Sequence, residues 1–244
     1  MRPFRTTGFD ASQRLCNHDP MTWASDWWLS ELERDPSYGS VVTPLLVEIL
    51  DARPGHTYLD LGCGEGQTMR ALTESGISVI GCDLDETLLP IASQAGPVVR
   101  CDLPDLSWLG NGAVDGAYAS LVVEHLEDPA AMFQEAHRVV RPGGVFAVVV
   151  NHPVFAAPAS GPIIDPEDGE VLWRWGRYLS GGRIIEPVGD SDITFYERPL
   201  SVLLNMAADT GWMLQHAIER AIEQSGAVSQ DEVPRLFAAR WGKQ

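Results

Sequence analysis

The chain has 244 residues, which suits one large α/β domain or two small ones, and 45% of them are hydrophobic. This composition excludes a globally disordered chain, and the length is enough to bury a substantial core without disulfide or metal support. The formal net charge of -17 disfavours phosphate backbones and anionic membrane surfaces as partners.

Two helices are expected over residues 22–52, where apolar residues recur at helical spacing. Beyond residue 56 short apolar strands alternate with helices, and this order predicts an α/β fold with a doubly wound, mostly parallel sheet. The expected strands are Tyr58–Leu61, Ser78–Gly81, Val98–Cys101, Val114–Ser120 and Val145–Val150, and the expected helices are Gln67–Ser75, Asp85–Ala92 and Asp128–Val140.

Residues 151–195 interrupt this alternation, because they are rich in proline, glycine and charge. A segment of this length without periodicity predicts a lid or a disordered stretch, and the aromatic residues within it favour the lid. A helix at Leu200–Asp209 and strands at Met213–Ile218 and Arg235–Arg240 are expected after it. We therefore expect one domain over residues 1–244, with a helical cap (1–52), a cofactor-binding core (53–150), a lid or acceptor insertion (151–199) and the C-terminal part of the sheet (200–244).

The turn after the first expected strand carries the most specific motif. Glycine stands at alternate positions, Gly62, Gly64 and Gly66, and a helix follows. Glycines let the backbone approach a ligand closely, and a helix N-terminus offers free N–H donors and partial positive charge to a carboxylate. Asp60, before the turn, can accept from an ammonium group. The turn, Cys63 included, therefore predicts a site for both charges of an amino-acid moiety.

Two further acids follow at the ends of the next strands. Asp83, with Leu84 beside it, comes about 20 residues after the glycines and can accept from both hydroxyls of a ribose. Asp102 can accept from an exocyclic amine such as that of adenine, and Leu103 can pack on the ring. An amino acid, a ribose and an adenine in that order describe S-adenosylmethionine.

A glycine-rich turn alone is also typical of an ordinary tight turn or of a dinucleotide site. The spacing here is Gly-x-Gly-x-Gly, whereas a dinucleotide site carries Gly-x-Gly-x-x-Gly. Together with the acids on two successive strand ends, this spacing favours S-adenosylmethionine over both alternatives.

The run from Asp60 to Gly66 resembles motif I of the class I S-adenosylmethionine-dependent methyltransferases. Residues 115–120 with 124–128 are similar to the family's fourth-strand motif and the helix start that follows it, and residues 138–144 resemble the run before its fifth strand. The resemblance covers residues 40–150 well and becomes looser through residues 196–200.

This resemblance implies a seven-stranded sheet whose last strand is antiparallel, and residues 196–200 resemble the lead into the sixth strand in small-molecule members of the family. It also implies S-adenosylmethionine as the cofactor and places Ser120 in the wall near the sulfonium. Methyl transfer from a sulfonium is an in-line displacement, so the protein mainly aligns the acceptor and excludes water.

A hydroxyl acceptor would also need a base, for which histidine is suited near pH 7. His152 follows the fifth expected strand, and the sequence supports a base and a plain loop residue equally. His125 follows the fourth, and a role in capping or orienting the next helix is favoured over a base. Tyr196 and Glu124 are weaker candidates, and a solvated or hydrogen-bonding role is favoured for Glu124.

Six aromatic residues could close an apolar acceptor pocket, with ordinary packing as the alternative for each. This content predicts a small, apolar or aromatic acceptor. The six are Trp23, Trp27, Trp28, Trp173, Trp175 and Tyr178.

Rival functions are a nicotinamide-dependent dehydrogenase, a cofactor-binding protein without catalysis, and an RNA or protein methyltransferase. The glycine spacing disfavours the first, and the acidic charge disfavours RNA. No CxxC pair, signal-like segment or apolar run of transmembrane length is present. We therefore expect a cytoplasmic protein with reduced cysteines, no metal, no nucleic-acid or membrane partner, and a homodimer as one candidate assembly.

Overall fold

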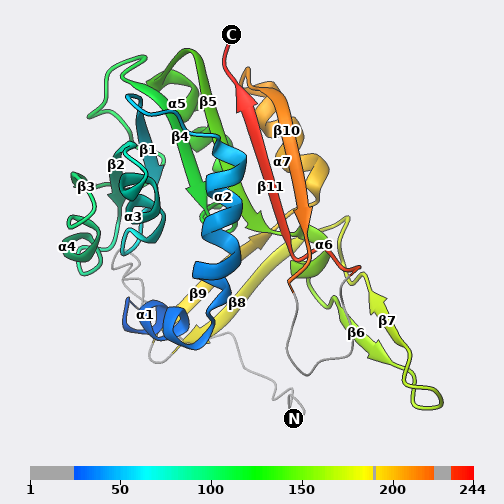
Figure 1. The fold of residues 1–244 in the computed structure, drawn as a ribbon. Coiled ribbons are helices and arrows are strands. Elements are labelled where there is room, and N and C mark those ends of the chain that lie inside the picture. The colour runs from blue at the N-terminus through cyan, green and yellow to red at the C-terminus, as the bar shows by residue number, and fades with distance from the viewer. Residues whose placement is uncertain (1–24, 189–190, 223–231) are drawn as a thin grey trace, which may run out of the picture.

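A computed structural model describes residues 25–188, 191–222 and 232–244 (Figure 1). Its central sheet has seven strands in the order β10-β11-β5-β4-β1-β2-β3. β11 runs antiparallel to both β5 and β10, whereas the other neighbours are parallel. The expected doubly wound sheet with an antiparallel last strand is thus confirmed. The strands are β1 (Thr57–Leu61), β2 (Ser78–Asp83), β3 (Val98–Arg100), β4 (Val114–Ser120), β5 (Val140–Asn151), β10 (Met213–Arg220) and β11 (Leu236–Gly242).

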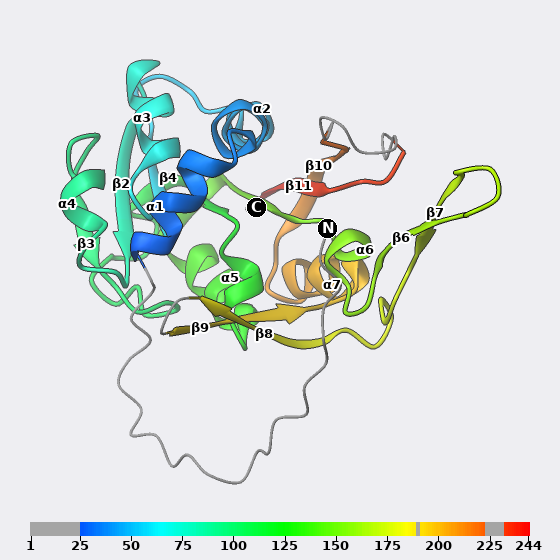
Figure 2. The same cartoon turned by 90° about the horizontal axis from the view of Figure 1, so that it is seen from below.

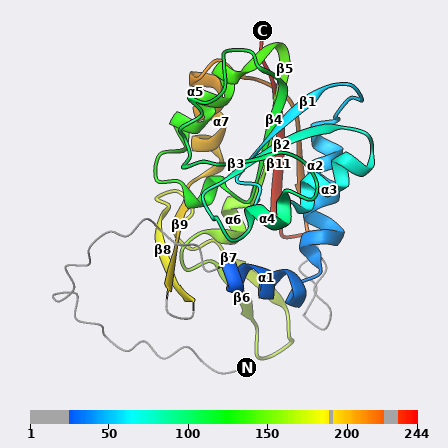
Figure 3. The same ribbon diagram turned by 90° about the vertical axis from the view of Figure 1, so that its left-hand side faces the viewer.

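Helices cover both faces of this sheet (Figure 3). On one face α2 (Thr43–Leu50) and α3 (Gln67–Glu74) bury Leu46 and Met69 against β1, β2 and β4. On the other face α5 (Pro129–Val139) and α7 (Leu200–Asp209) bury a second apolar cluster. The inner strands β4, β5 and β11 are mostly buried, as expected for the apolar run of the fifth strand, whereas the edge strand β10 is largely exposed.

The carboxyl ends of the parallel strands share one edge of the sheet, the lower edge in Figure 1. Helix α1 (Ser25–Arg34) lies below this edge and connects through the π-helical turn η1 (Tyr38–Val42) to α2. The 3₁₀ turn η2 (Val123–His125) follows β4 at the same edge. Of the two N-terminal helices expected from the sequence, α1 therefore lies where open α/β sheets bind ligands, whereas α2 covers a face of the sheet.

The insertion after β5 forms two antiparallel hairpins, preceded by the short helix α6 (Pro153–Ala156). The β8–β9 hairpin crosses beneath the sheet on the same side as α1, whereas the β6–β7 hairpin projects away from the body (Figures 1 and 2). Only the β8–β9 part of the insertion is thus placed where a lid was expected. The strands are β6 (Gly161–Ile164), β7 (Val171–Arg174), β8 (Gly182–Val188) and β9 (Ser191–Glu197).

One helix is shorter than the sequence indicates. α4 spans only Leu89–Ala92, although a helix from Asp85 was expected. The Asp85 carboxylate accepts hydrogen bonds from the backbone N and the hydroxyl of Thr87, at 2.8 and 2.5 Å. This local bonding holds a turn in place of the first helical residues. Along the described ranges, no helix combines the length and apolarity that a bilayer span requires.

Candidate active site

A cavity opens at the carboxyl ends of β1 to β4, beneath the sheet. It holds about 1060 Å³ including its open mouth, a size suited to a small organic ligand. Its wall is formed by Trp27, Trp28, Tyr38, Gly62, Gly64, Asp83, Leu84, Leu88, Cys101, Asp102, Leu103, Ser120, Leu121, Val122, Glu124, His125, Leu126, Asn151 and Phe195.

The glycine turn after β1 forms one end of this wall. Gly62 has φ 75°, and a Cβ there would lie 2.6 Å from Cγ2 of Val122. Gly66 has φ 82° and is the N-cap of α3, where a Cβ would lie 2.8 Å from the Cα of Ala92. Gly62 therefore leaves room for the Val122 side chain in the cavity wall, whereas Gly66 lets α3 approach α4 and does not line the cavity.

Asp83 joins the ends of β1 and β2. Its Oδ2 accepts from the backbone N of Gly64 at 2.7 Å, and its Oδ1 accepts from the N of Asp85 at 2.9 Å. Burial raises the pKa of this carboxyl, although the backbone hydrogen bonds oppose the shift. The carboxylate is thus fixed at the cavity wall, where ribose hydroxyls could bind to it.

Asp60 and Cys63 line an adjoining recess beneath the same turn. Asp60 is 3% exposed, and its pKa lies well above the usual range because of burial, with Asp83 and Glu65 adding to the effect. Burial likewise raises the pKa of the Cys63 thiol. Buried acids that repel one another are stabilised by a cationic ligand, so this recess suits an ammonium group.

The end of β3 supplies Asp102 and Leu103, and Leu84 follows β2 beside them in the same wall. These apolar side chains with one carboxylate match the expected adenine site. Ser120 closes the wall at the end of β4. Asp60 beneath the glycine turn, the fixed Asp83, and Asp102 with Leu103 together suit the amino-acid, ribose and adenine parts of S-adenosylmethionine.

Helix α1 closes the cavity from below. The Trp28 indole N–H donates to Oε2 of Glu65 at 2.8 Å, and its ring packs edge-on against Tyr38 at 5.1 Å between centroids. Glu65, 5% exposed, is also paired with Arg70 through Oε1 at 3.3 Å. Helix α1 is thereby hydrogen-bonded to the glycine turn.

The far end of the cavity is built by η2, β5 and β9. Nδ1 of His125 lies 3.3 Å from the carbonyl of Thr194, so this nitrogen carries the proton, and the ring packs on Phe195 at 4.8 Å. Burial lowers the pKa of His125 to about 4, so the ring is neutral at pH 7. His125 thus lines the cavity as a neutral residue that holds the β8–β9 hairpin. The role favoured for it from the sequence, capping of the next helix, is wrong, because the Asp128 side chain caps α5.

Glu124 was ranked low from the sequence, yet it is the most unusual group in this wall. It is 7% exposed, and burial raises its pKa to about 7. Oε1 accepts from the backbone N and Nδ2 of Asn151, at 3.3 and 3.0 Å. The signal that could have found it is its position in the turn at the carboxyl end of β4, next to His125.

His152 does not line the cavity. The ring is 2% exposed; Nδ1 accepts from the N of Val154 at 3.1 Å, and Nε2 therefore donates to Glu219 at 2.8 Å. Burial lowers its pKa, although Glu219 opposes the shift. Both nitrogens are engaged away from the cavity, so of the two roles that the sequence supports equally the geometry favours the non-catalytic one, here as the cap of α6.

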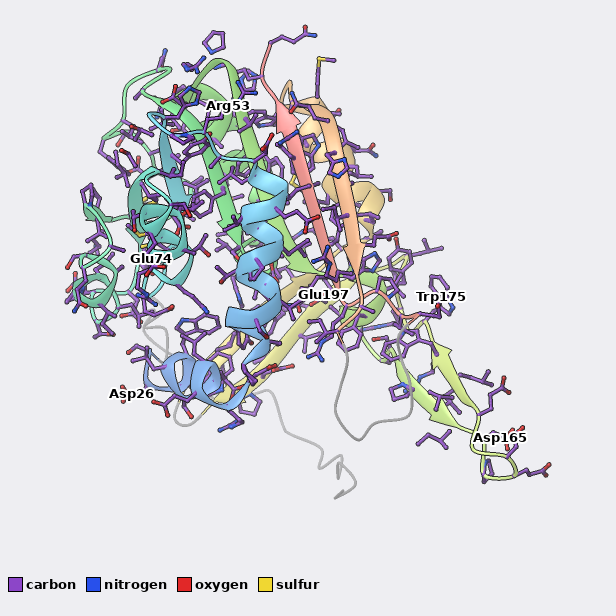
Figure 4. The ribbon with its side chains drawn as sticks, viewed as in Figure 1. Asp26, Arg53, Glu74, Asp165, Trp175 and Glu197 are labelled. Atoms are coloured by element: carbon purple, nitrogen blue, oxygen red, sulfur yellow. The ribbon has the colours of Figure 1, made fainter. Side chains whose placement is uncertain are left out.

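The expected aromatic pocket is formed only in part. Trp27 and Trp28 line the cavity, whereas Trp173 stacks on Phe155 at 5.2 Å and Trp175 is 58% exposed beside Tyr178. Figure 4 shows Trp175 and Asp165 on the β6–β7 side of the molecule, far from Asp26 of α1. Trp173 lies on the hairpin that projects away, Trp175 and Tyr178 follow that hairpin, and Trp23 lies outside the described residues.

Cys82 and Cys101 are buried at the ends of β2 and β3, where small apolar fillers were expected. In the part of the chain that the structure describes, no three His, Cys, Asp or Glu side chains are grouped to hold a metal ion.

Comparison with known proteins agrees with this geometry. The family model described as a methyltransferase domain matches residues 59–148. The crystal structure of an S-adenosylmethionine-dependent methyltransferase from Mesorhizobium loti is 29% identical, with a TM-score of 0.69 over 83% of this chain and 99% of that one.

Two curated relatives match this chain over only part of their own length. An uncharacterized 37.1 kDa protein in transposon TN4556 of Streptomyces fradiae is 39% identical over 228 residues, 84% of this chain and 61% of that protein. A ubiquinone biosynthesis O-methyltransferase of Pseudomonas paraeruginosa is 33% identical over 139 residues, 52% of this chain and 59% of the enzyme. The chain thus spans about three fifths of these relatives.

Proposed function

Because the chain belongs to the class I S-adenosylmethionine-dependent methyltransferases, we propose that it transfers the methyl group of this cofactor to a small molecule. The observation that carries the proposal is one cavity that runs from the glycine turn at Gly62 and Gly64 to Glu124, Asn151 and Phe195. The first end fits the cofactor, and the second is left for an acceptor.

The cofactor residues act by binding and orientation. Asp60 and the turn that follows it hold the amino-acid moiety, Asp83 holds the ribose, and Asp102 with Leu103 holds the adenine. When bound, the cofactor supplies an electrophilic methyl group and a neutral thioether as the leaving group. Ser120 and Val122, in the wall between the two ends, limit the path along which the acceptor reaches the methyl group.

The acceptor end supports a small, largely apolar or aromatic molecule. Its wall combines Trp27, Tyr38 and Phe195 with the polar side chains of Glu124 and Asn151. Closure by α1 and the β8–β9 hairpin excludes water and aligns the acceptor, and alignment of this kind is worth roughly 7–11 kcal/mol. The O-methyltransferase among the relatives and the acidic charge of the chain favour a small-molecule acceptor over nucleic acid. The cytoplasmic location and the homodimer stay predictions.

Calorimetric titration with S-adenosylmethionine and, separately, with NAD tests the cofactor assignment. We expect wild type to bind S-adenosylmethionine, and Asp83→Asn and Asp83→Ala to lose most of the affinity. Asp168→Ala, an exposed acid on the β6–β7 hairpin, is the matched control and should bind as wild type does. Binding of NAD instead of S-adenosylmethionine would reject the proposal in favour of a dehydrogenase.

A further inference from the structure

Among the described residues, only one of the two carboxylate oxygens of Glu124 has a hydrogen-bond partner. Oε1 accepts from both donors of Asn151, which fixes the side chain between the ends of β4 and β5. Oε2 is buried and has no hydrogen-bond partner among the described residues. Buried polar atoms are nearly always satisfied, so an unsatisfied carboxylate oxygen at a cavity wall points to a donor that a ligand supplies.

The charged groups around Glu124 leave this oxygen available. Arg198, which is close enough to lower the pKa of Glu124, donates instead to the carbonyls of Tyr196 and Glu127, at 2.7 and 2.9 Å. Glu197 repels Glu124, and burial raises the pKa of Glu197 to about 8. Tyr38 faces the same cavity from η1, and its pKa is raised, chiefly by burial. The ring of His125, which is adjacent in the chain, is neutral at pH 7.

Resting on the proposed function, we propose that Oε2 of Glu124 receives the hydroxyl of a phenolic acceptor and takes up its proton during methyl transfer. The acceptor oxygen forms a bond to the methyl carbon, and the bond from that carbon to sulfur breaks with its electron pair left on sulfur. The hydroxyl proton moves to the Glu124 carboxylate and afterwards leaves to solvent. Glu124 thus acts as a catalytic base, and Asn151 is a positioning residue.

The pKa values of the base and of the acceptor hydroxyl favour a phenol over an alkyl alcohol. Glu124, with a pKa of about 7, exchanges protons readily near neutral pH. A phenol has a pKa of about 10, within reach of such a base, whereas an alkyl alcohol resembles water at about 15.7 and is not. The aromatic side chains of Trp27, Tyr38 and Phe195 in the same wall suit an aromatic ring.

Catechol serves as the probe, and methyl transfer from labelled S-adenosylmethionine is followed between pH 5.5 and 9. We expect the wild-type rate to rise through pH 7 and level off. Glu124→Gln should lose about a hundredfold or more in rate together with that pH dependence. Glu127→Gln, an exposed glutamate three residues along, is the matched control and should retain both. Wild-type pH dependence and rate in Glu124→Gln would overturn the inference.

A second measurement needs no turnover. Wild-type protein is labelled with 13C at the glutamate carboxyl and saturated with S-adenosylhomocysteine. The resonance of Glu124 is identified as the one that is missing from Glu124→Gln. This resonance should titrate near neutrality and should shift when catechol is added to saturation. A resonance that neither titrates between pH 5 and 9 nor responds to catechol overturns the inference. Wild type that fails to bind S-adenosylmethionine in the calorimeter rejects the proposed function itself, so the two failures are distinguishable.

Discussion

The indole N–H of Trp28 donates to the carboxylate of Glu65 at 2.8 Å, and this hydrogen bond fastens α1 to the glycine turn after β1. The two residues are 37 positions apart in the chain, and both line the recess that adjoins the main cavity. The closure of the cavity by α1 therefore depends on a polar contact as well as on apolar packing.

Removal of this donor should loosen α1 and weaken cofactor binding. Trp28→Phe keeps an aromatic ring against Tyr38 but leaves Oε2 of Glu65 without the indole. A hydrogen bond to a charged group contributes about 1.5–3 kcal/mol, and part of it persists through water, so we expect the Kd for S-adenosylmethionine to rise roughly five- to tenfold. Calorimetry measures the change. An unchanged Kd, with the melting temperature also unchanged, would contradict the role assigned to this contact.

Gly62 should be intolerant of a side chain for two separable reasons. Its positive φ costs a non-glycine residue about 1–2 kcal/mol, and the clash of a Cβ with Val122 adds about 1–3 kcal/mol. Gly55→Ala is the matched control, because Gly55 has φ 83° and a Cβ there would meet no other atom within 4 Å. Urea unfolding should show Gly62→Ala as the less stable variant, and Val122→Ala in the same chain should restore part of the loss. Equal stability of the two alanine variants would rule out the clash.

His152 should matter for stability and not for the cofactor. His152→Ala removes the acceptor that caps α6, which costs about 1 kcal/mol, with further loss from the space left behind. His152→Asn keeps a capping oxygen and should recover part of the stability. Cofactor affinity measured by calorimetry should match wild type in both variants. A large loss of affinity in His152→Asn would place this residue nearer to the site than the geometry does.

The cofactor end of the site was predictable from the sequence because its residues follow strand ends in chain order. Asp60, Asp83 and Asp102 each stand at or just after the end of a parallel strand, and such ends must meet at one edge of a sheet. The spacing of the glycines between Asp60 and Asp83 then distinguished an S-adenosylmethionine site from a dinucleotide site. Local sequence was therefore enough to predict both the fold and the cofactor end of the cavity.

The acceptor end was not predictable, because it depends on contacts between distant segments. Glu124 becomes a buried, half-partnered acid only because Asn151, 27 residues away, takes one oxygen and the β8–β9 hairpin covers it. The hairpin pairing itself has no clear alternation in the sequence, with Pro187 within β8. For His152 the sequence suggested too much. Its position after β5 indicated a functional site, but the direction of its side chain is set by Glu219, 67 residues away.

Glu124 should make the protein less stable as the pH rises. Its folded pKa of about 7 lies above the usual value of 4.5, so the folded state keeps a proton that the unfolded state releases between these values. Stability from this group is therefore lost from about pH 4.5 to pH 7 and stays low above. Relative to wild type, Glu124→Gln should gain about 2–3 kcal/mol in the free energy of unfolding between pH 5 and pH 8. Urea titrations at both pH values measure this gain, and a constant difference would contradict the buried-acid assignment.

Cofactor binding should release protons. Burial raises the pKa values of Asp60 and Asp83 in the ligand-free protein, so both carboxyls retain protons at higher pH than usual. The cationic groups of S-adenosylmethionine favour the ionised carboxylates, so the complex holds fewer protons than the free protein and affinity should increase as the pH rises through the range in which these carboxyls titrate. Calorimetry in two buffers of different ionisation enthalpy gives the number of protons released, which should fall in Asp83→Asn. Heats that do not depend on the buffer, or affinity that falls as the pH rises, would mean that these acids already carry their charge before the cofactor arrives.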